Sequence, residues 1–360
     1  MEEEELWFAC LQGKVEDVIN LLQDSHINPN GRGSISETPL YIACDKGYLE
    51  IVKLLLNDQR VVINKAGNIG ETPFYVACRN GHIEVVKLLL SDNRVDINNN
   101  EYGFTPFYVA CKNGYIEIVK LLLNDERIDV NKAKTFGQTA FHVACSNGRT
   151  EIVKLLLNDR RADINMENNR GDTPFYSACE IGDIEVVKLL LNDQRVDINE
   201  ANHYHQTPFY IACYHGRTEI VKLLLNDQRV DINKIDSFGR TPFLIACEKG
   251  YIEIVEYLIA SGREVNVNTK NNNGETAMNI ARKRGNEEKG RWESEEEFQK
   301  RKKKRSKIIE LLESFERNPI ETRFKLRLKL ELAGKIQFSF IFFNFFFLFL
   351  SSKMFLLSRL

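Results

Sequence analysis

The chain has 360 residues and a formal net charge of −2, with 43% hydrophobic and 28% charged residues. That length and composition suit two or three ordinary domains, or one long repeat array with a buried core. The near-neutral charge excludes a protein that binds nucleic acid or membranes through a global basic excess. The acidic start, residues 1–6, lacks the apolar core of a secretory signal, so we expect a cytoplasmic protein, with nuclear or membrane-associated placement as alternatives.

The first element in chain order is a short unit within residues 1–34, running from about Leu6 to Gly33. It contains Ala9-Cys10, a pair that recurs down the chain, but it lacks the Thr-Pro pair that opens most later units. The end units of repeat arrays are atypical because they have a neighbour on one side only. We therefore predict that residues 1–34 form an N-terminal capping repeat.

Residues 35–272 hold seven copies of one pattern. Threonine opens the copies at Thr38, Thr72, Thr105, Thr139, Thr173, Thr207 and Thr241, and the same position recurs at Thr276. The intervals are 34, 33, 34, 34, 34, 34 and 35 residues. All eight cysteines keep the same phase, at Cys10, Cys44, Cys78, Cys111, Cys145, Cys179, Cys213 and Cys247. A fixed period of this length indicates stacked supersecondary units.

One copy, residues 70–103, shows how each unit should fold. Thr72 stands at a helix N-cap and Pro73 at the first helical position, where its missing N–H is not needed. Gly81 can end this short helix in a left-handed conformation. A second amphipathic helix is expected over residues 83–90, followed by an extended loop. Such a unit has too little core to stand alone, so neighbouring copies must stack.

The strings Thr-Pro-Phe-Tyr-Val-Ala-Cys at 72–78 and Asn-Gly-His-Ile-Glu-Val-Val-Lys-Leu-Leu-Leu at 80–90 resemble the ankyrin repeat family. The resemblance extends over about residues 6–315. It implies an all-α solenoid of about nine helix-turn-helix units with short β-hairpin-like loops. Tyrosine usually replaces the histidine of the family motif, at Tyr41, Tyr75, Tyr108, Tyr176 and Tyr210, whereas His142 keeps it. Cysteine replaces the second alanine, and Asn-Asp replaces the glycine after the second helix.

The repeated cysteines occupy equivalent positions on successive first helices. Buried cysteine behaves as a small hydrophobic residue, so we interpret the eight as core residues. The alternative is a row of redox thiols or metal ligands. No Cys-x-x-Cys motif and no Cys/His pair at ligand spacing supports that alternative.

The resemblance implies a partner protein on the concave face, made by the loop tips and the exposed parts of the first helices. These positions vary between units while the framework stays constant, and exposed tyrosine and arginine are typical of interfaces. The predicted partner-binding residues are Lys46, Arg79, Tyr102, Lys112, Phe136, Arg170, Tyr204, Tyr214, His215 and Phe238. The alternative is that exposed positions drift without constraint. Mixed charges on this face make a nucleic-acid track unexpected.

The sequence also contains one cluster with a weak metal-binding pattern. His203, His205, Tyr214 and His215 fall close together, although exposed histidines are more often simple polar contacts. No phosphate-binding loop, zinc motif or nucleophile elbow is present. We therefore expect no cofactor, no bound metal and no enzyme. An enzyme with its site in the charged C-terminal insertion remains the alternative from another functional class.

The last repeat, residues 273–315, contains a charged insertion at 286–307, which delays its second helix to about Ile308–Phe315. Pairs such as Glu296 with Lys300 and Glu297 with Arg301 have the i,i+4 spacing of an exposed helix. Two interpretations of the basic run 300–305 stay open. In the first, the run is a solvated helical extension of the last repeat. In the second, it is a functional basic segment, either a nuclear localisation signal or a patch that binds an anionic surface.

The C-terminal segment, residues 316–360, departs from the repeat. Apolar and basic residues alternate over 323–332, which favours a strand or a surface-bound segment, with a helix as the alternative. Twelve of the fifteen residues at 336–350 are apolar. Three readings stay open for that tail: a membrane anchor through 336–357, a segment that docks on the array, and a translation artefact. The main functional prediction is a monomeric scaffold that binds a partner protein, and the alternative is a membrane-tethered adaptor.

Overall fold

The computed structural model describes residues 2–33, 36–68, 70–99 and 103–331. It divides into two compact units, Met1–Pro208 and Phe209–Leu360. Within the described ranges every assigned element is a helix. The helices form nine consecutive pairs followed by one additional helix. The prediction of an all-α repeat solenoid of about nine helix-turn-helix units is therefore confirmed.

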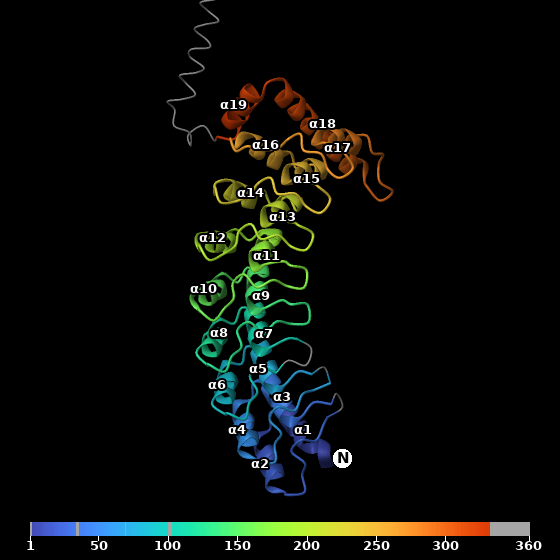
Figure 1. Ribbon diagram of the computed structural model, residues 1–360. Coiled ribbons are helices and arrows are strands. Elements are labelled where there is room, and N and C mark those ends of the chain that lie inside the picture. Colours follow the sequence, from blue (N-terminus) through green and yellow to red (C-terminus); the bar gives the residue numbers. More distant parts are fainter. Residues whose placement is uncertain (1, 34–35, 69, 100–102, 332–360) are drawn as a thin grey trace, which may run out of the picture. The chain divides into compact units, whose positions relative to one another are not determined.

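In the first unit, six helix pairs stack in two layers. The first helices are α1 (Glu2–Gln12), α3 (Pro39–Lys46), α5 (Pro73–Asn80), α7 (Pro106–Asn113), α9 (Ala140–Ser146) and α11 (Pro174–Ile181). The second helices are α2 (Val15–Gln23), α4 (Leu49–Asn57), α6 (Ile83–Leu90), α8 (Ile116–Leu123), α10 (Thr150–Asn158) and α12 (Ile184–Asn192). The loops between pairs project from the layer of first helices (Figure 1).

The second unit continues the same pattern and ends differently. Its paired helices are α13 (Pro208–Tyr214), α14 (Thr218–Leu225), α15 (Pro242–Lys249), α16 (Ile252–Ala260), α17 (Ala277–Gly285) and α18 (Glu295–Arg317). The additional helix, α19 (Pro319–Lys329), packs against α16 and α18.

The first helices begin and end as the sequence predicts. The Thr72 side chain accepts a hydrogen bond from the Tyr75 amide at 3.2 Å, which satisfies a backbone donor at the start of α5. Gly81 ends the helix with φ of 80°, a left-handed conformation that favours glycine. A Cβ at that position would also lie 2.9 Å from the Tyr115 ring of the next pair. The Thr-Pro and glycine markers thus fix both the helix ends and the close stacking.

Neighbouring second helices are joined by a recurring arginine. Arg94 Nη2 donates to the Leu56 carbonyl at 2.9 Å, and the same guanidinium pairs with Asp92 at 2.6 Å. Arg127 repeats the arrangement on the Leu90 carbonyl, again at 2.9 Å. The terminal carbonyls of a helix lack partners within it, so each arginine caps the helix of the preceding repeat. The Asp-x-Arg sequence after each of these second helices therefore links one repeat to the preceding one.

All eight cysteines are buried and unbonded, which confirms that they lie in the core. Burial raises the pKa of the Cys10 thiol to about 12 and raises the thiol pKa further at the other seven positions, Cys44 and Cys78 among them. A thiol must ionise to act as a nucleophile or a metal ligand. These side chains therefore serve as small apolar residues where adjacent first helices approach closely.

The charged insertion and the second helix of the last repeat form one helix. α18 runs from Glu295 to Arg317 and begins with a capping box between Ser294 and Glu297. The basic run 300–305 is thus helical, as the helical-extension interpretation expected, and its role as a localisation signal or an anionic-surface patch stays a prediction. Glu297 serves the cap rather than pairing with Arg301, which pairs instead with Glu293 at 2.9 Å.

The expectation of a strand after residue 316 is wrong, because α19 is a helix. Asn318 caps it, Pro319 occupies its first position, and Thr322 and Leu326 are buried on one face at i,i+4 spacing. Arg327 Nε donates to the Ala260 carbonyl at 2.8 Å, so α19 closes the end of α16. Tertiary contacts outweigh the alternating pattern, and Leu328 stays 54% exposed.

Candidate functional site

The loop tips of the first unit are shaped by buried asparagines. Asn168 Oδ1 accepts hydrogen bonds from the Arg170 amide at 2.8 Å and the Asp172 amide at 3.1 Å. Asn202 repeats this with the amides of Tyr204 at 3.0 Å and Gln206 at 3.1 Å. Each asparagine side chain accepts the amide hydrogen bonds that a backbone carbonyl accepts in an ordinary turn. The turn therefore holds the residue two positions later at the tip of the loop.

The second unit uses the same device with an aspartate. Asp236 Oδ1 accepts from the Phe238 amide at 2.9 Å and the Arg240 amide at 2.8 Å. Its other oxygen, Oδ2, accepts from Tyr210 Oη at 2.8 Å and from Arg240 Nη2 at 2.7 Å. Burial first, and then the Asp236 charge, raise the pKa of Tyr210. The tyrosine therefore stays protonated and donates to the carboxylate.

Successive tip loops within each unit are also joined to one another. The Asn169 amide donates to the Phe136 carbonyl at 3.1 Å, and the His203 amide donates to the Arg170 carbonyl at 3.0 Å. In the second unit the Asn272 amide donates to the Phe238 carbonyl at 3.0 Å. These bonds resemble single rungs of a sheet, although no strand is assigned in the described residues. Hydrogen bonds within each loop and hydrogen bonds to the adjacent loop thus both order these tips.

The predicted tip residues present their side chains to solvent. Phe136 is 69% exposed, Tyr204 53% and Phe238 58%, and the Arg170 side chain is 65% exposed although its Nε lies 3.0 Å from Asp172. All four occupy the same position of the repeat, three residues before the threonine that begins the next first helix. Tyr102, which shares this position in the sequence, lies outside the described residues. The structure therefore places large side chains on rigid, solvent-facing backbone.

The predicted residues on the first helices fall into different environments. Lys46 is exposed and lies 3.2 Å from Asp45. Arg79 is held on both sides, by Asp45 at 3.0 Å and by Glu71. The same Glu71 carboxylate accepts from Tyr41 Oη at 3.0 Å. Arg79 is thus part of a polar network within the array. The sequence did not reveal this network, because the two carboxylates that pair with Arg79 come from different positions of the repeat.

Lys112 differs from Lys46 and Arg79, because the charged group near it is another lysine, Lys134. Lys134 Nζ lies 5.2 Å from the centre of the Phe104 ring and 5.5 Å from that of Tyr108. Burial, and then the nearby charge of Lys112, lower the pKa of Lys134. Neither lysine has an ion-pair partner among the residues the structure describes. The sequence prediction included Lys112 and missed Lys134, whose role depends on aromatic contacts from the preceding repeat.

In the second unit, Tyr214 and His215 contact each other edge to face with ring centres 5.0 Å apart. Lys249, which was not among the predicted residues, places its Nζ 4.0 Å from the centre of the Tyr214 ring. Lysine above an aromatic ring is attracted to its negative face. These three side chains form one exposed aromatic and cationic patch at the ends of α13 and α15.

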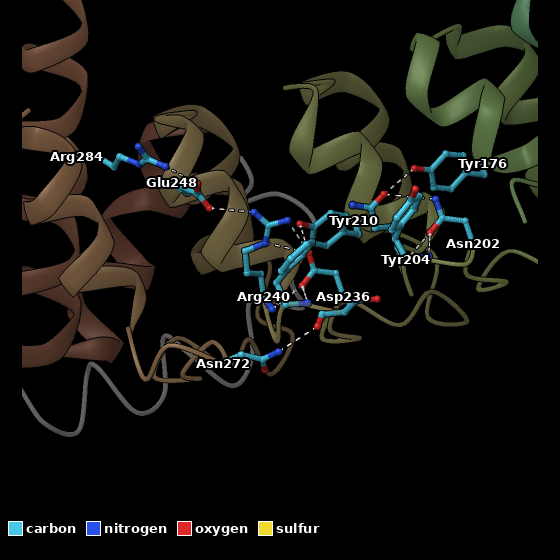
Figure 2. Close-up of polar contacts among 12 residues, drawn as sticks. Tyr176, Asn202, Tyr204, Tyr210, Asp236, Arg240, Glu248, Asn272 and Arg284 are labelled. Carbon is cyan, nitrogen blue, oxygen red and sulfur yellow. Dashed lines mark hydrogen bonds and ion pairs between the residues drawn. The ribbon is translucent and has the colours of Figure 1, made fainter. Parts of the chain in front are cut away.

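A pocket of about 260 Å³ opens beside Phe238 in the second unit. Its lining residues are Phe238, Arg240, Glu248, Asn271, Asn272, Asn273, Glu275, Ile280, Lys283 and Arg284. Glu248 lies 2.9 Å from Arg284 and 3.5 Å from Arg240, and Figure 2 shows the chain of polar contacts from Asp236 through Arg240 and Glu248 to Arg284. Of these lining residues, only Phe238 was among the predicted partner-binding residues. The others come from separate parts of the sequence, and no local pattern indicates that they lie together.

Figure 2 also shows the corresponding contacts at the end of the first unit, where Tyr176, Asn202 and Tyr204 are labelled. Tyr176 Oη donates to Gln206 Oε1 at 3.1 Å, and Asn202 Nδ2 donates to Asp172 Oδ1 at 2.9 Å. The Asp172 side chain is 3% exposed. The hydrogen bond from Asn202 satisfies this buried carboxylate, so the network anchors the loop that carries Tyr204.

The remaining expectations concern a metal and a membrane segment. In the described ranges no three His, Cys, Asp or Glu side chains come together as a metal-binding group, and His203 and His205 are both exposed. None of the described helices is long and apolar enough to cross a membrane. The candidate anchor at 336–357 lies outside the described residues.

Comparison with known proteins gives one clear result. A family model described as ankyrin repeats (3 copies) matches residues 6–101, 58–134, 93–168, 115–202, 160–236 and 228–292. These overlapping matches extend over most of the helix pairs described above. No curated protein matches the chain.

Proposed function

The chain belongs to the ankyrin repeat family, whose members generally mediate protein–protein interaction, and from that premise we propose that it is a non-catalytic scaffold that binds a partner protein through its loop tips and first helices. The array acts as a monomer in this proposal, because each tip loop is shaped by residues of its own chain. No group transfer or bond cleavage is needed for such a role.

The observation that carries the proposal is the rigid display of Phe136, Tyr204 and Phe238. An exposed aromatic side chain on a flexible loop loses conformational entropy when a partner orders it. At the tips that carry Tyr204 and Phe238, the side chain of a buried Asn or Asp already fixes the backbone by accepting its amide hydrogen bonds, and at the tip that carries Phe136 the backbone carbonyl accepts a hydrogen bond from the Asn169 amide of the next loop. Aromatic side chains dominate interface energetics, and preordering leaves more of their binding energy as affinity.

The chemistry of the surface also limits the partner. Lys112 and Lys134 lie together without a carboxylate, so an acidic side chain of the partner is favoured at that point of the first unit. In the second unit the charged side chains of the pocket pair with one another. Phe238 and the mostly buried Ile280 leave an apolar contact for a partner side chain. We propose an extended partner segment with both acidic and apolar residues.

The test is affinity capture with the full chain, followed by measurement of the dissociation constant for the captured partner. The triple variant Phe136→Ala, Tyr204→Ala, Phe238→Ala should weaken binding by at least tenfold, because each lost hot spot is worth about 1–2 kcal/mol. A control triple, Val62→Ala, Ile184→Ala, Ile320→Ala, removes exposed apolar side chains away from the tips. The proposal fails if both triples bind the same partner with the affinity of the wild-type chain.

A further inference from the structure

Charge is unevenly distributed along the chain in spite of its near-neutral total. Residues 1–281 contain 29 Lys and Arg against 40 Asp and Glu, a net charge of −11. Residues 282–331 contain 17 against 11, a net charge of +6. The chain up to residue 281 is therefore acidic, whereas the segment that contains α18 and α19 is basic. A local field of this kind attracts an anionic surface even when the whole protein does not.

The basic run of α18 divides into two classes of residue. Arg305 is buried and Arg301 is occupied by Glu293 at 2.9 Å and by the Glu288 carbonyl at 3.2 Å. These two arginines hold the fold together. Lys302 places its Nζ 5.8 Å from the centre of the Phe298 ring, and none of the lysines of the run pairs with a carboxylate in the described residues.

Four lysines lie on the exposed side of α18. Lys300, Lys303, Lys304 and Lys307 are all exposed, and none of them pairs with a carboxylate in the described part of the chain. At 100° per residue they fall within an arc of about 100° around the helix. Glu296 and Glu310 lie at the two ends of this stripe, one turn before Lys300 and one turn after Lys307. We refer to the four as the α18 lysine face.

An exposed tryptophan directly precedes this helix. Trp292 is 90% exposed, the largest exposed fraction of any large hydrophobic side chain in the described residues. Its loop is braced by the Arg301 contacts and by a hydrogen bond from the Gly290 amide to Glu293 at 3.1 Å. Arg291 lies over the indole ring, 5.2 Å from its centre. The loop thus holds an exposed indole next to a cation, just before α18 begins.

From this arrangement we propose that the α18 lysine face, together with Trp292, docks on an anionic phospholipid membrane. Lysines in such a face attract anionic headgroups without specific geometry, and the face contains no arginine for bidentate contacts to bases. Tryptophan is enriched at the membrane–water interface. The proposal is independent of the loop-tip scaffold.

The first measurement is binding of the full chain to vesicles of phosphatidylcholine alone and to vesicles with added phosphatidylserine. The ratio of the two binding constants isolates the electrostatic contribution to binding. Replacing Lys300, Lys303 and Lys307 by Gln should reduce binding to the anionic vesicles by about a hundredfold, at roughly fivefold for each lysine. Glutamine is a good helix former, so α18 should be preserved, and circular dichroism checks this. Raising the salt to 1 M should remove the preference for anionic vesicles.

The matched control is the triple variant Lys53→Gln, Lys87→Gln, Lys120→Gln. These lysines lie on second helices of the repeats, where each is paired with a glutamate three residues earlier. This variant should bind both vesicle types as the wild-type chain does. Equal binding to the two compositions by the wild-type chain, or an equal loss in both triple variants, would overturn the proposal.

The chain's two tryptophans provide a second readout. Trp7 is 4% exposed and Trp292 is 90% exposed, so only Trp292 can move from water into lipid without unfolding. Its emission should shift to the blue when anionic vesicles are added, and Trp292→Phe should abolish the shift. Unchanged emission, or tighter binding to a single-stranded RNA than to the anionic vesicles at the same salt, would show that the lysines serve a soluble polyanion instead.

Discussion

Arg305 Nη1 donates a hydrogen bond to the Cys247 carbonyl at 2.5 Å, although the two residues are 58 positions apart. Elsewhere in the array a residue 37 positions along makes a similar contact, to the carbonyl one position after the cysteine, as Arg149 does on Lys112 and His82 on Asp45. The insertion in the last repeat lengthens the chain between the two partners. Arg305, which lies in the middle of α18, therefore makes a contact similar to one that other repeats make from the residue at the start of their second helix.

The first prediction concerns this contact. Arg305→Ala should lower the free energy of unfolding of the second unit by about 1.5–3 kcal/mol, because a buried hydrogen bond to a charged group is lost. Hydrogen exchange of the α15 and α18 amides measures the loss locally. Lys304→Ala, one position away and exposed, is the control and should have little effect. An equal effect of the two substitutions would mean that helix propensity alone accounts for the change.

His142 supplies a second prediction, about pH. It is buried, its Nε2 donates to the Asp172 carbonyl at 3.0 Å, and its Nδ1 accepts from the Thr139 amide at 3.2 Å. Burial lowers its pKa below the ordinary value of 6.5. The unfolded chain therefore binds a proton more readily than the folded chain, so stability is full above pH 6.5 and falls as the pH drops below it.

The variant His142→Tyr isolates this effect, because tyrosine occupies the same repeat position at Tyr108 and Tyr176. Urea unfolding between pH 5 and 7.5 should show a smaller loss of stability for the variant than for the wild-type chain at the acidic end. Parallel stability curves for the two proteins across that range would contradict the assignment of the acid sensitivity to His142.

The cysteines give a third prediction. A thiol reagent such as 5,5′-dithiobis(2-nitrobenzoate) should leave the native chain almost unlabelled at pH 8, because all eight thiols are buried and their pKa values are raised. In 6 M guanidinium chloride the same reagent should titrate eight thiols. Rapid labelling of one or more thiols in the native state would indicate local opening of a first helix.

Much of this fold follows from local sequence, and the exceptions share one physical cause. Thr72, Pro73 and Gly81 act on their own helix, so their roles could be predicted from spacing alone. The exposure of Phe136 and Phe238 could also be predicted, because the loops between helix pairs lie outside the core, and their role in binding stays a prediction. Arg79, Lys134 and Arg305 were placed by partners more than 20 residues away, and no short pattern encodes such contacts. The helix α19 was only the alternative to a strand for the same reason, since its docking on α16 outweighs its alternating sequence.

The last prediction compares the tip loops of the two units. Asn202 donates to the buried Asp172 carboxylate at 2.9 Å, whereas the equivalent Asp236 accepts from Arg240. Asn202→Asp should therefore remove a donor and place two carboxylates together. We expect a loss of about 1–3 kcal/mol in the free energy of unfolding at pH 7, with a smaller loss near pH 4 where one carboxylate can be protonated.

The added substitution Gln206→Arg should recover much of that loss, because residue 206 occupies the same repeat position as Arg240. The double variant copies the Asp236–Arg240 pair into the first unit, and Tyr176 can donate to the new carboxylate as Tyr210 does to Asp236. Urea unfolding of the single and double variants measures the rescue. If Gln206→Arg stabilised the wild-type chain as much as it stabilised Asn202→Asp, the two positions would not be coupled, and the buried Asn or Asp would not be what orders the tip that carries Tyr204.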